Sequence, residues 1–234
     1  MGDGMALDAS KRNNKIIALV GWQGTGKDTV ADYLANLHEF RRDSFAATLK
    51  DAVSVVFGWN RQLLDGRTHE SRVWRELIDP WWAQRLNIPT LTPRWVLQQW
   101  GTQVLRGQFH DDIWIASLEN KMRQTTDNVV VSDCRFPNEV HAIRAAGGQV
   151  IWVQRGPLPE WYECALRQNT TPIRFQLTHE TMEVMYPEVH PSEWSWVGTP
   201  FDAVIDNNAD GYDNLYRQLD QLAIDLQRAP CHRS

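Results

Sequence analysis

Apolar residues follow two different spacings along the chain. Short, continuous runs of β-branched residues predict buried strands, most clearly at Val129, Val130 and Val131. The predicted strands cover residues 15–20, 40–45, 128–132, 150–153 and 203–205. Between them, apolar residues recur every three or four positions, which predicts helices over residues 28–38, 49–57, 93–106, 111–122, 138–146 and 212–226. Strands that alternate with helices favour an α/β fold, with a parallel sheet and helices on both faces.

Capping residues mark several of the predicted helix ends. Thr92 and Pro93 combine a capping hydroxyl with a proline at the first helical position, which is a typical helix start. Gly58 follows one predicted helix, and Gly147 with Gly148 follows another, as expected at C-terminal ends.

Two long segments lack a sustained period. Residues 59–91 are rich in Arg, Asp, Trp and Pro and are interpreted as a helical excursion from the core. Residues 156–200 have the length of a flap or lid. The whole pattern predicts a flexible N-terminus at residues 1–14 and a single domain at residues 15–228, which carries both segments as insertions.

Composition narrows the class of protein. The 234 residues are 42% hydrophobic and 23% charged, which fits a globular domain and disfavours disorder or a coiled coil. No apolar stretch approaches the ~20 residues that a membrane span needs. The N-terminus is polar and lacks the apolar core of a secretion signal. We therefore expect a cytosolic protein without a membrane partner.

The charge balance and the cysteines restrict the ligands. The net charge is −5 and the basic residues are dispersed, so long DNA or RNA is a disfavoured partner, whereas small anions remain candidates. Three widely spaced cysteines (Cys134, Cys164 and Cys231) fit neither a disulfide framework nor a metal site and are interpreted as reduced thiols. The twelve tryptophans are interpreted mainly as packing residues.

A glycine-rich loop lies between the first predicted strand and the first predicted helix. Its sequence runs from Gly21 to Thr29, with Gly24, Thr25 and Gly26 preceding Lys27. Glycines allow backbone N–H groups to surround a phosphate, the helix N-terminus adds positive potential, and the lysine reaches the β- and γ-phosphates. A dinucleotide site is the competing interpretation, but the glycines are in a different order and a lysine in the loop suits a triphosphate.

One position of this loop departs from the usual phosphate-loop pattern. Asp28 stands where serine or threonine normally binds magnesium, and the hydroxyl follows at Thr29. A carboxylate also binds magnesium, directly or through water, so both residues are candidate ligands.

A second acidic position follows the strand at residues 128–132. Asp133 is expected at the carboxyl end of that strand, where ligands bind in parallel sheets, so it is a candidate for holding magnesium or its water. A turn or a helix cap is the alternative role. Arg135 lies two residues later and could bind phosphate in a forked geometry, with a salt bridge to Glu139 as the alternative.

An ordered set of short blocks resembles the bacteriophage deoxynucleoside monophosphate kinases, a branch of the phosphate-loop (P-loop) nucleoside monophosphate kinases. The blocks extend over about residues 15–226. They comprise residues 26–29, Phe45-Ala46, residues 49–51, Arg94 with Leu97-Gln98 and Gly101-Thr102, residues 133–139, Arg155 and residues 190–193. The resemblance implies a P-loop NTPase-type α/β fold, ATP as donor, Mg2+, and a deoxynucleoside monophosphate as acceptor. It also implies a phage-encoded enzyme of the host cytoplasm.

The resemblance also implies roles for individual residues. Lys27, Asp133 and Arg135 would act during phosphoryl transfer, and the loop residues with Arg155 would bind ATP. Candidates for the acceptor are Lys50, Arg94, Gln98 and Arg135; candidates for magnesium are Asp28, Thr29 and Asp133. Residues 59–91 would lie on the acceptor side, and Arg155 with the region of Arg174 would supply lid charges. Lys50 could instead pair with Asp51 or an adjacent helix, and Arg94 could be solvated.

Other readings remain open from the sequence. The donor half would look the same in a kinase of another small phosphorylated acceptor, such as dephospho-coenzyme A. A kinase of modified bases in phage DNA and a nucleotide-binding regulator are more distant alternatives. Base and sugar specificity, the role of His190, Ser192 and Glu193, and the oligomeric state, a homodimer included, are not determined by the sequence.

Overall fold

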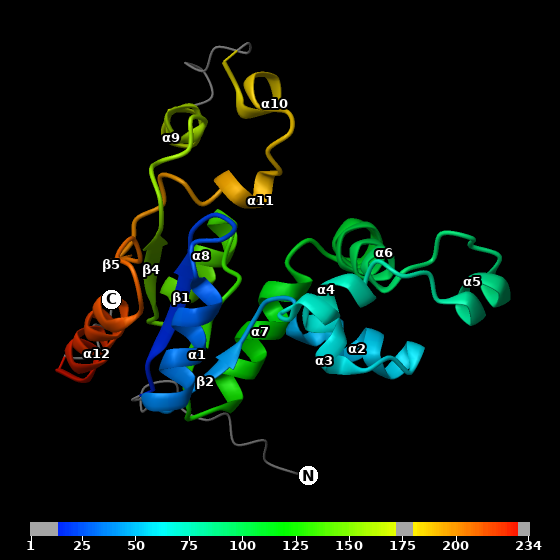
Figure 1. Cartoon of the computed structure of the whole chain (residues 1–234), viewed down its shortest axis with the longest axis horizontal. Coiled ribbons are helices and arrows are strands. Elements are labelled where there is room, and N and C mark those ends of the chain that lie inside the picture. The colour runs from blue at the N-terminus through cyan, green and yellow to red at the C-terminus, as the bar shows by residue number, and fades with distance from the viewer. Residues whose placement is uncertain (1–13, 172–179, 229–234) are drawn as a thin grey trace, which may run out of the picture. The chain divides into compact units, whose positions relative to one another are not determined.

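The computed structural model describes residues 14–171 and 180–228 and divides the chain into two compact units (Figure 1). The first unit combines the chain up to Ser44 with the chain from Lys121 onward. The second unit spans Phe45–Asn120 and therefore contains the predicted excursion at residues 59–91. Most of the predicted N-terminal segment, residues 1–14, lies outside the described residues.

A parallel five-stranded sheet forms the centre of the first unit, as predicted. The strands lie in the order β2-β3-β1-β4-β5. All neighbouring pairs are parallel; Ile17 of β1 is in register with Val130 of β3, and Ala18 with Val150 of β4. Because both sides of β1 are covered, every residue of this strand is buried. The bounds are β1 (Ile16–Val20), β2 (Phe40–Asp43), β3 (Asn128–Val131), β4 (Gln149–Gln154) and β5 (Ala203–Asp206).

Helices cover both faces of this sheet. On one face, α1 (Lys27–Leu37) and α12 (Asp213–Arg228) pack together over alternate strand residues such as Ile17 and Leu19. On the other face, α8 (Pro137–Ala145) contacts β1 and β4 (Figure 1). This alternation arises because successive strand residues point to opposite faces of a sheet. The α/β class predicted from the sequence is confirmed.

The described parts of the predicted lid, residues 156–171 and 180–200, contain three helices, although the sequence shows no sustained period there. They are α9 (Tyr162–Thr170), α10 (Met182–Met185) and α11 (Pro191–Trp194). Asn169 of α9 donates to the backbone oxygens of Trp194 and Val197, which ties α9 to α11. Two of these helices have only four residues, too short to produce a recognisable period. Arg174 lies outside the described residues.

The second unit is helical, as expected for the excursion at residues 59–91, although the sequence shows no sustained period there. Three short helices lie in that segment, and each begins at a side-chain cap: Asn60, Thr68 and Asp79. Their five to seven residues form too few turns for a period to stand out. The bounds in this unit are α2 (Ala47–Phe57), α3 (Arg61–Asp65), α4 (His69–Trp74), α5 (Pro80–Leu86) and α6 (Pro93–Gln98). The chain continues through a π-helix, η2 (Gln99–Phe109), into α7 (Ile113–Gln124), which crosses the boundary between the units.

The helix predicted over residues 93–106 begins as expected but changes type. Thr92 accepts a hydrogen bond from the backbone of Trp95, which confirms the cap. After Gln98 the backbone becomes π-helical, a widened turn with i→i+5 bonds. A Cβ on Gly101 would lie 2.8 Å from Leu49 Cδ2, and the Gly101 carbonyl accepts from Trp114 Nε1 at 2.9 Å. Gly101 therefore lets η2 approach α2 closely, which the hydrophobic period does not reveal.

Two further observations concern the cysteines and the length of the helices. Cys134 and Cys164 are both unpaired and buried, whereas Cys231 lies outside the described residues. Within residues 14–171 and 180–228, no helix has the length and apolar character needed to cross a membrane.

Candidate phosphate-binding site

The predicted phosphate loop connects β1 to α1 and adopts a backbone that requires glycine. Gly21, Gly24 and Gly26 have φ angles of 141°, 85° and 96°. A Cβ on Gly21 would lie 2.6 Å from the Val153 carbonyl oxygen, and one on Gly26 would lie 2.5 Å from Asn207 Nδ2. Asn207 also donates to the Thr25 carbonyl at 2.9 Å, so the end of β5 supports the loop. The loop is thus held against β4 and β5 at the carboxyl end of the sheet.

Lys27 is the cation of this loop. Its Nζ donates to the carbonyl oxygens of Gly21 at 2.6 Å and Trp22 at 2.8 Å. Burial of the ammonium, and secondarily the charge of Arg135, lowers the pKa of Lys27 to about 8, while Glu193, Asp28 and Asp133 act in the opposite direction. Arg135 and Asp133 therefore both lie within electrostatic reach of the loop lysine.

Asp28 faces a partner that the sequence reasoning missed. Arg42, in β2, pairs with the Asp28 carboxylate through Nη2 and with Asp32 through Nη1 at 2.7 Å. Arg42 Nη2 also donates to Ser132 Oγ at 3.2 Å. The sequence indicated this contact only through the Arg41-Arg42 pair in a predicted strand. Arginines at such positions are ordinarily expected to point into solvent.

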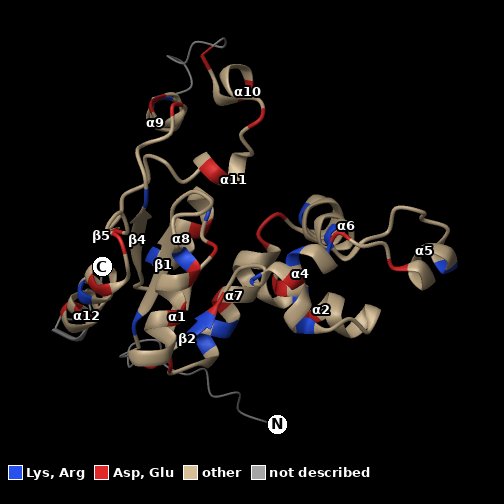
Figure 2. Cartoon of the chain, viewed as in Figure 1, with Lys and Arg blue, Asp and Glu red and all other residues tan. Residues whose placement is uncertain are grey.

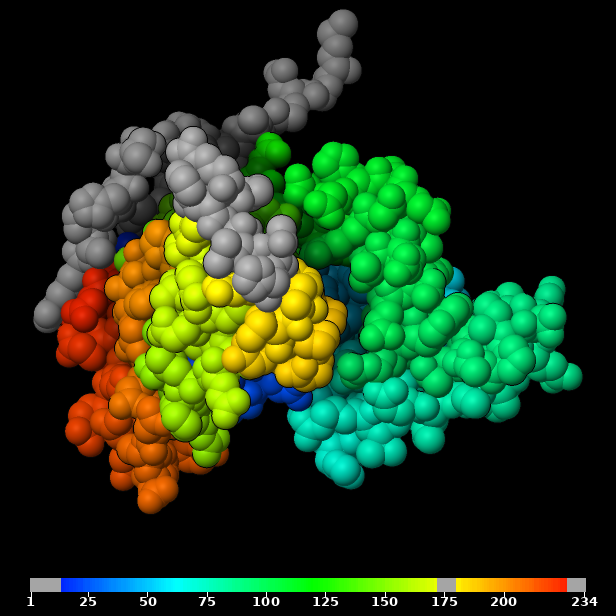
Figure 3. Space-filling model, turned by 90° about the horizontal axis from the view of Figure 1, so that it is seen from above, coloured from blue at the N-terminus to red at the C-terminus, as the bar shows by residue number. Residues whose placement is uncertain are grey.

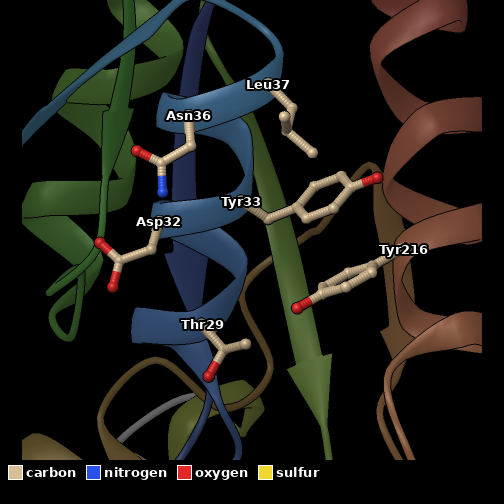
Figure 4. A pocket seen from close by; sticks show the side chains of 6 residues that line it. All are labelled: Thr29, Asp32, Tyr33, Asn36, Leu37 and Tyr216. Carbon is tan, nitrogen blue, oxygen red and sulfur yellow. The ribbon is translucent and has the colours of Figure 1, made fainter.

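Thr29 and Asp28 point to different sides of α1. Thr29 lines a pocket of about 400 Å³ on the flank of α1, together with Asp32, Tyr33, Asn36, Leu37 and, from α12, Tyr216 (Figure 4). The rings of Tyr33 and Tyr216 stack with centroids 4.1 Å apart. The two magnesium candidates next to Lys27 therefore have different surroundings.

Arg135 is held at both its backbone and its side chain. Glu139, a buried residue of α8, accepts the backbone N–H groups of Arg135 at 2.8 Å and Phe136 at 3.2 Å. The guanidinium Nη1 donates to Ser192 Oγ at 3.0 Å and to Glu193 Oε1 at 2.9 Å. The alternative role considered for Arg135 was a salt bridge with Glu139; in the structure Glu139 accepts from the Arg135 backbone, and the guanidinium pairs with Glu193.

Residues 190–193, whose role the sequence left open, reach the phosphate loop. Glu193 Oε2 accepts the backbone N–H of Gln23 at 2.5 Å. His190 Nδ1 accepts the backbone N–H of Ser192 at 3.2 Å and lies 2.9 Å from its hydroxyl, so it caps α11. This block therefore connects α11, the loop and Arg135.

An aromatic cluster, which the sequence indicated only as general tryptophan packing, surrounds Trp22 of the loop. Its ring lies 6.1 to 6.5 Å from the rings of Trp152, Trp161, Tyr162 and Trp196. Trp196 is 1% exposed. The phosphate loop is thereby packed against β4, α9 and the segment that follows α11.

The residues present are compatible with magnesium bound together with a nucleotide. In the described part of the chain, no three His, Cys, Asp or Glu side chains gather into a metal cluster. Magnesium commonly takes one or two carboxylates and completes its shell with substrate phosphates and water. Asp133, partly buried beyond the end of β3, and Asp28 provide such carboxylates beside the loop.

Of the acceptor candidates in the second unit, Lys50 lies in a cluster of charges around Asp65. Lys50 Nζ is 3.2 Å and Arg61 Nη1 is 2.7 Å from Asp65 Oδ1, so Lys50 pairs with the adjacent helix α3. Arg94 is half exposed and lies 3.4 Å from Glu76, and Gln98 is exposed.

Arg75 is a further cation of this cluster that the sequence reasoning missed. Its guanidinium packs over Gly66, and its Nε is buried without a hydrogen-bond partner among the described residues. Burial and the charge of Arg94 lower the pKa of Arg75. No motif contains Arg75, so only the packing of α3 and α4 could reveal it.

Arg155, the predicted lid cation, follows β4 directly and is exposed. The next residue, Gly156, donates its backbone N–H to Asn208 Oδ1 at 2.6 Å. Arg155 thus lies on a connection that is held to the segment following β5.

Comparisons with known proteins agree with the resemblance seen in the sequence. The family model described as deoxynucleotide monophosphate kinase matches residues 83–160. The "Putative deoxynucleotide monophosphate kinase" of Acanthamoeba polyphaga mimivirus is 32% identical, and the match covers 60% of this chain and 74% of that protein. The chain belongs to the deoxynucleotide monophosphate kinase family. The deoxynucleoside-5'-monophosphate kinase of Escherichia phage T5 is 26% identical, with 55% of this chain and 71% of that protein covered.

The match to the deoxynucleotide monophosphate kinase model spans only part of the site. It includes Arg94, Gln98, Asp133, Arg135 and Arg155, whereas the phosphate loop lies before it and Glu193 after it. Among solved structures, the dephospho-CoA kinase from Campylobacter jejuni is similar with a TM-score of 0.39 and 13% identity, over 93% of this chain and all of that one.

Proposed function

We propose that this member of the family transfers the γ-phosphoryl group of ATP directly to a deoxynucleoside monophosphate, yielding the diphosphate and ADP. One observation carries the proposal: Lys27 and Arg135 meet at a glycine-rich loop whose backbone is shaped for phosphate, in a chain of this kinase family. Phosphoryl transfer between two anions depends mainly on alignment and charge neutralisation, which these groups supply.

The donor half of the reaction uses residues of the first unit. The loop N–H groups would bind the ATP phosphates, and Lys27 would turn from the loop carbonyls to the β- and γ-phosphates. Arg135 would neutralise the charge on the transferred group, and Arg155 would contact ATP from the segment after β4. Magnesium, when bound with the nucleotide, would add positive charge at the transferred phosphate, with Asp133 as its principal protein partner and Asp28 and Thr29 as further candidates.

The transfer itself requires no general base. An oxygen of the acceptor phosphate forms a bond to the γ-phosphorus, and the bond from that phosphorus to the oxygen shared with the β-phosphate breaks, leaving ADP. The attacking oxygen is already ionised, so no proton has to be removed from it. The protein must instead hold both partners in line and keep water from the γ-phosphate.

The acceptor half is proposed to use the basic cluster of the second unit, and Arg135 stays a further candidate for the acceptor phosphate. Four cations of this cluster, Lys50, Arg61, Arg75 and Arg94, face the three carboxylates of Asp51, Asp65 and Glu76, so positive charge is in excess. A buried guanidinium nitrogen without a partner is costly, and an anionic phosphate oxygen would satisfy it. Gln98, exposed on α6, is proposed to contact the base.

The surroundings of the enzyme are a further part of the proposal. The two unpaired, buried thiols are compatible with a reducing compartment such as the cytoplasm, and the viral relatives suggest the cytoplasm of an infected host. Lys and Arg positions are interspersed with Asp and Glu in both units (Figure 2), which suits small anionic substrates better than a polymer.

The test supplies purified protein with labelled ATP and Mg2+ and a panel of acceptors. The panel contains the free deoxynucleoside and ribonucleoside monophosphates, dephospho-coenzyme A, and single- and double-stranded DNA. We expect label in at least one deoxynucleoside diphosphate and none in DNA. Transfer to dephospho-coenzyme A or DNA with every mononucleotide inert would overturn the proposed acceptor while keeping the donor half.

A further inference from the structure

The carboxylate of Glu193 occupies hydrogen-bond donors that a phosphate would use. One of its oxygens accepts the backbone N–H of Gln23 in the phosphate loop at 2.5 Å, and the other accepts from Arg135 Nη1 at 2.9 Å. In the space-filling view, the yellow atoms of the segment that carries α10 lie beside blue atoms of the segment that carries β1 and α1 (Figure 3). A carboxylate and a phosphate present similar anionic oxygens, and both are bound by backbone N–H groups and guanidinium.

Contacts of the preceding residue and of its own backbone hold Glu193 in position. Ser192 accepts a hydrogen bond from the same Arg135 Nη1, at 3.0 Å. The Glu193 carbonyl accepts from Trp196 Nε1 at 2.8 Å, and the Trp196 ring stacks on Trp22 of the loop with centroids 6.3 Å apart. Only 19% of the Glu193 side chain is exposed. The contact is therefore part of a packed arrangement rather than a chance meeting of two surface charges.

The charges around this contact explain why it forms and why it must break. Lys27 and Arg135 disfavour each other's charge, and Glu193 partly relieves that effect, since it raises the pKa of Lys27 where Arg135 lowers it. A nucleotide phosphate would supply the same compensation. A carboxylate and a phosphate on the same two donors would repel each other at close range, so they cannot both remain there.

We propose that Glu193 is a positioning residue that substitutes for a phosphate: it holds Arg135 beside the phosphate loop until the phosphates of ATP displace it, and α11 then leaves the loop. The inference rests on the proposed function, because it assigns the loop and Arg135 to ATP. It adds that the nucleotide phosphates bind the loop and Arg135 as the Glu193 carboxylate leaves them.

A competing anion weakens binding of the ligand that replaces it. Removing the charge of Glu193 must therefore strengthen nucleotide binding, since the phosphate no longer has to break an ion pair. A Glu193 that served only to keep the loop or Arg135 in shape would produce the opposite result, because its loss would leave the site less ordered. The direction of the change thus separates the two roles.

The experiment measures binding rather than turnover. Titration calorimetry with pyrophosphate, which has no base or sugar, and with ATP compares the wild-type chain with Glu193→Gln and Glu193→Ala. Because the pair is partly exposed, we expect both ligands to bind roughly three- to tenfold more tightly to either variant. Glu188→Gln removes the same charge from an exposed position of the same segment and serves as the matched control, with unchanged binding.

Thermal unfolding provides a second measurement on the same proteins. Without ligand, the wild type should unfold at a higher temperature than Glu193→Gln, because only the wild type has the ion pair. With saturating pyrophosphate the difference should shrink, because the pair is then broken in the wild type as well. Unchanged or weaker binding to both Glu193 variants, an equal effect in Glu188→Gln, or a thermal difference that persists with ligand would each overturn the inference. Failure of the proposed function remains distinguishable, because it would appear as ATP binding without phosphorylation of any mononucleotide.

Discussion

Lys27 Nζ lies 2.6 Å from the carbonyl oxygen of Gly21, the first glycine of its own loop. The lysine thus returns across the loop and binds the carbonyls of Gly21 and Trp22 with the same group that would bind phosphate. Because the ammonium is largely removed from water, its pKa is lowered to about 8. An anion bound at the loop would stabilise the charged form of this lysine, so the site favours a phosphate beside Lys27.

Substitution of Lys27 tests whether this residue contributes to phosphoryl transfer. Lys27→Ala should leave the fold intact and slow turnover by about 10- to 150-fold, which corresponds to the loss of a charge-assisted contact of ~1.5–3 kcal/mol. Steady-state kinetics with saturating ATP and acceptor, together with a circular dichroism spectrum, provide the measurement. A folded variant with nearly normal turnover would remove Lys27 from the reaction.

The magnesium candidates are separated by paired substitutions. Asp133→Asn should lower activity and raise the Mg2+ concentration needed for half-maximal rate, because Asn keeps the size of the side chain and removes its charge. Asp28→Asn should shift the Mg2+ requirement less, because Arg42 already binds that carboxylate. Mg2+ titrations of both variants give the comparison. Equal shifts would mean that both carboxylates hold the ion, and no shift in Asp133→Asn would favour a capping role.

The basic cluster of the second unit should control the acceptor and not the donor. Arg75→Ala and Arg94→Ala should raise the KM for the deoxynucleoside monophosphate or lower turnover, with ATP binding nearly unchanged, because a phosphate contact of ~1.5–3 kcal/mol is lost. Lys50→Ala should behave in the same way. The control is Arg85→Ala, an exposed arginine of α5 in the same unit. Weakened ATP binding with normal acceptor dependence would contradict the assignment.

Asp65 should make the stability of the protein depend on pH in the acidic range. Burial alone would raise the pKa of Asp65, but the hydrogen bond from Arg61 and the charge of Lys50 outweigh it and the net pKa lies below the ordinary value. A carboxyl with a lowered pKa contributes stability above its unfolded pKa of ~3.9, and this contribution is lost as the pH falls through the folded pKa. Asp65→Asn should therefore be less stable than the wild type at pH 7, with a difference that disappears under strongly acidic conditions.

Denaturant unfolding at several pH values measures this difference. Asp51→Asn, at a more exposed partner of the same Arg61, is the control and should cost less. A difference that stays constant from pH 7 into the acidic range would show that the Asp65 charge does not contribute.

The parallel sheet, the alternation of strands and helices and the glycine-rich loop after the first strand could be read from the residues. Lys15–Val20 and Val129–Val131 are apolar runs that have to be buried on both faces, and Gly21, Gly24 and Gly26 can adopt backbone angles that other residues rarely adopt. These are local properties, so they can be read without knowing what lies nearby. The bounds of the individual helices in the helical excursion at residues 59–91 were not predicted, because five-residue helices carry no clear period. The π-helix after Gln98 was not predicted either, because Gly101 depends on its contact with Leu49.

Which polar and charged side chains pair with one another follows from the folded arrangement. Strand order and helix packing bring together Arg42 with Asp28, Arg75 with Arg94, and Glu193 with Gln23 and Arg135. The contact between Glu193 and Gln23 joins residues that are 170 positions apart. Sequence can place a residue at the end of a strand, as it did for Asp133. Whether a nearby charge is free to bind a ligand or already paired depends on distances of a few ångströms between distant segments, and only the folded chain determines those distances.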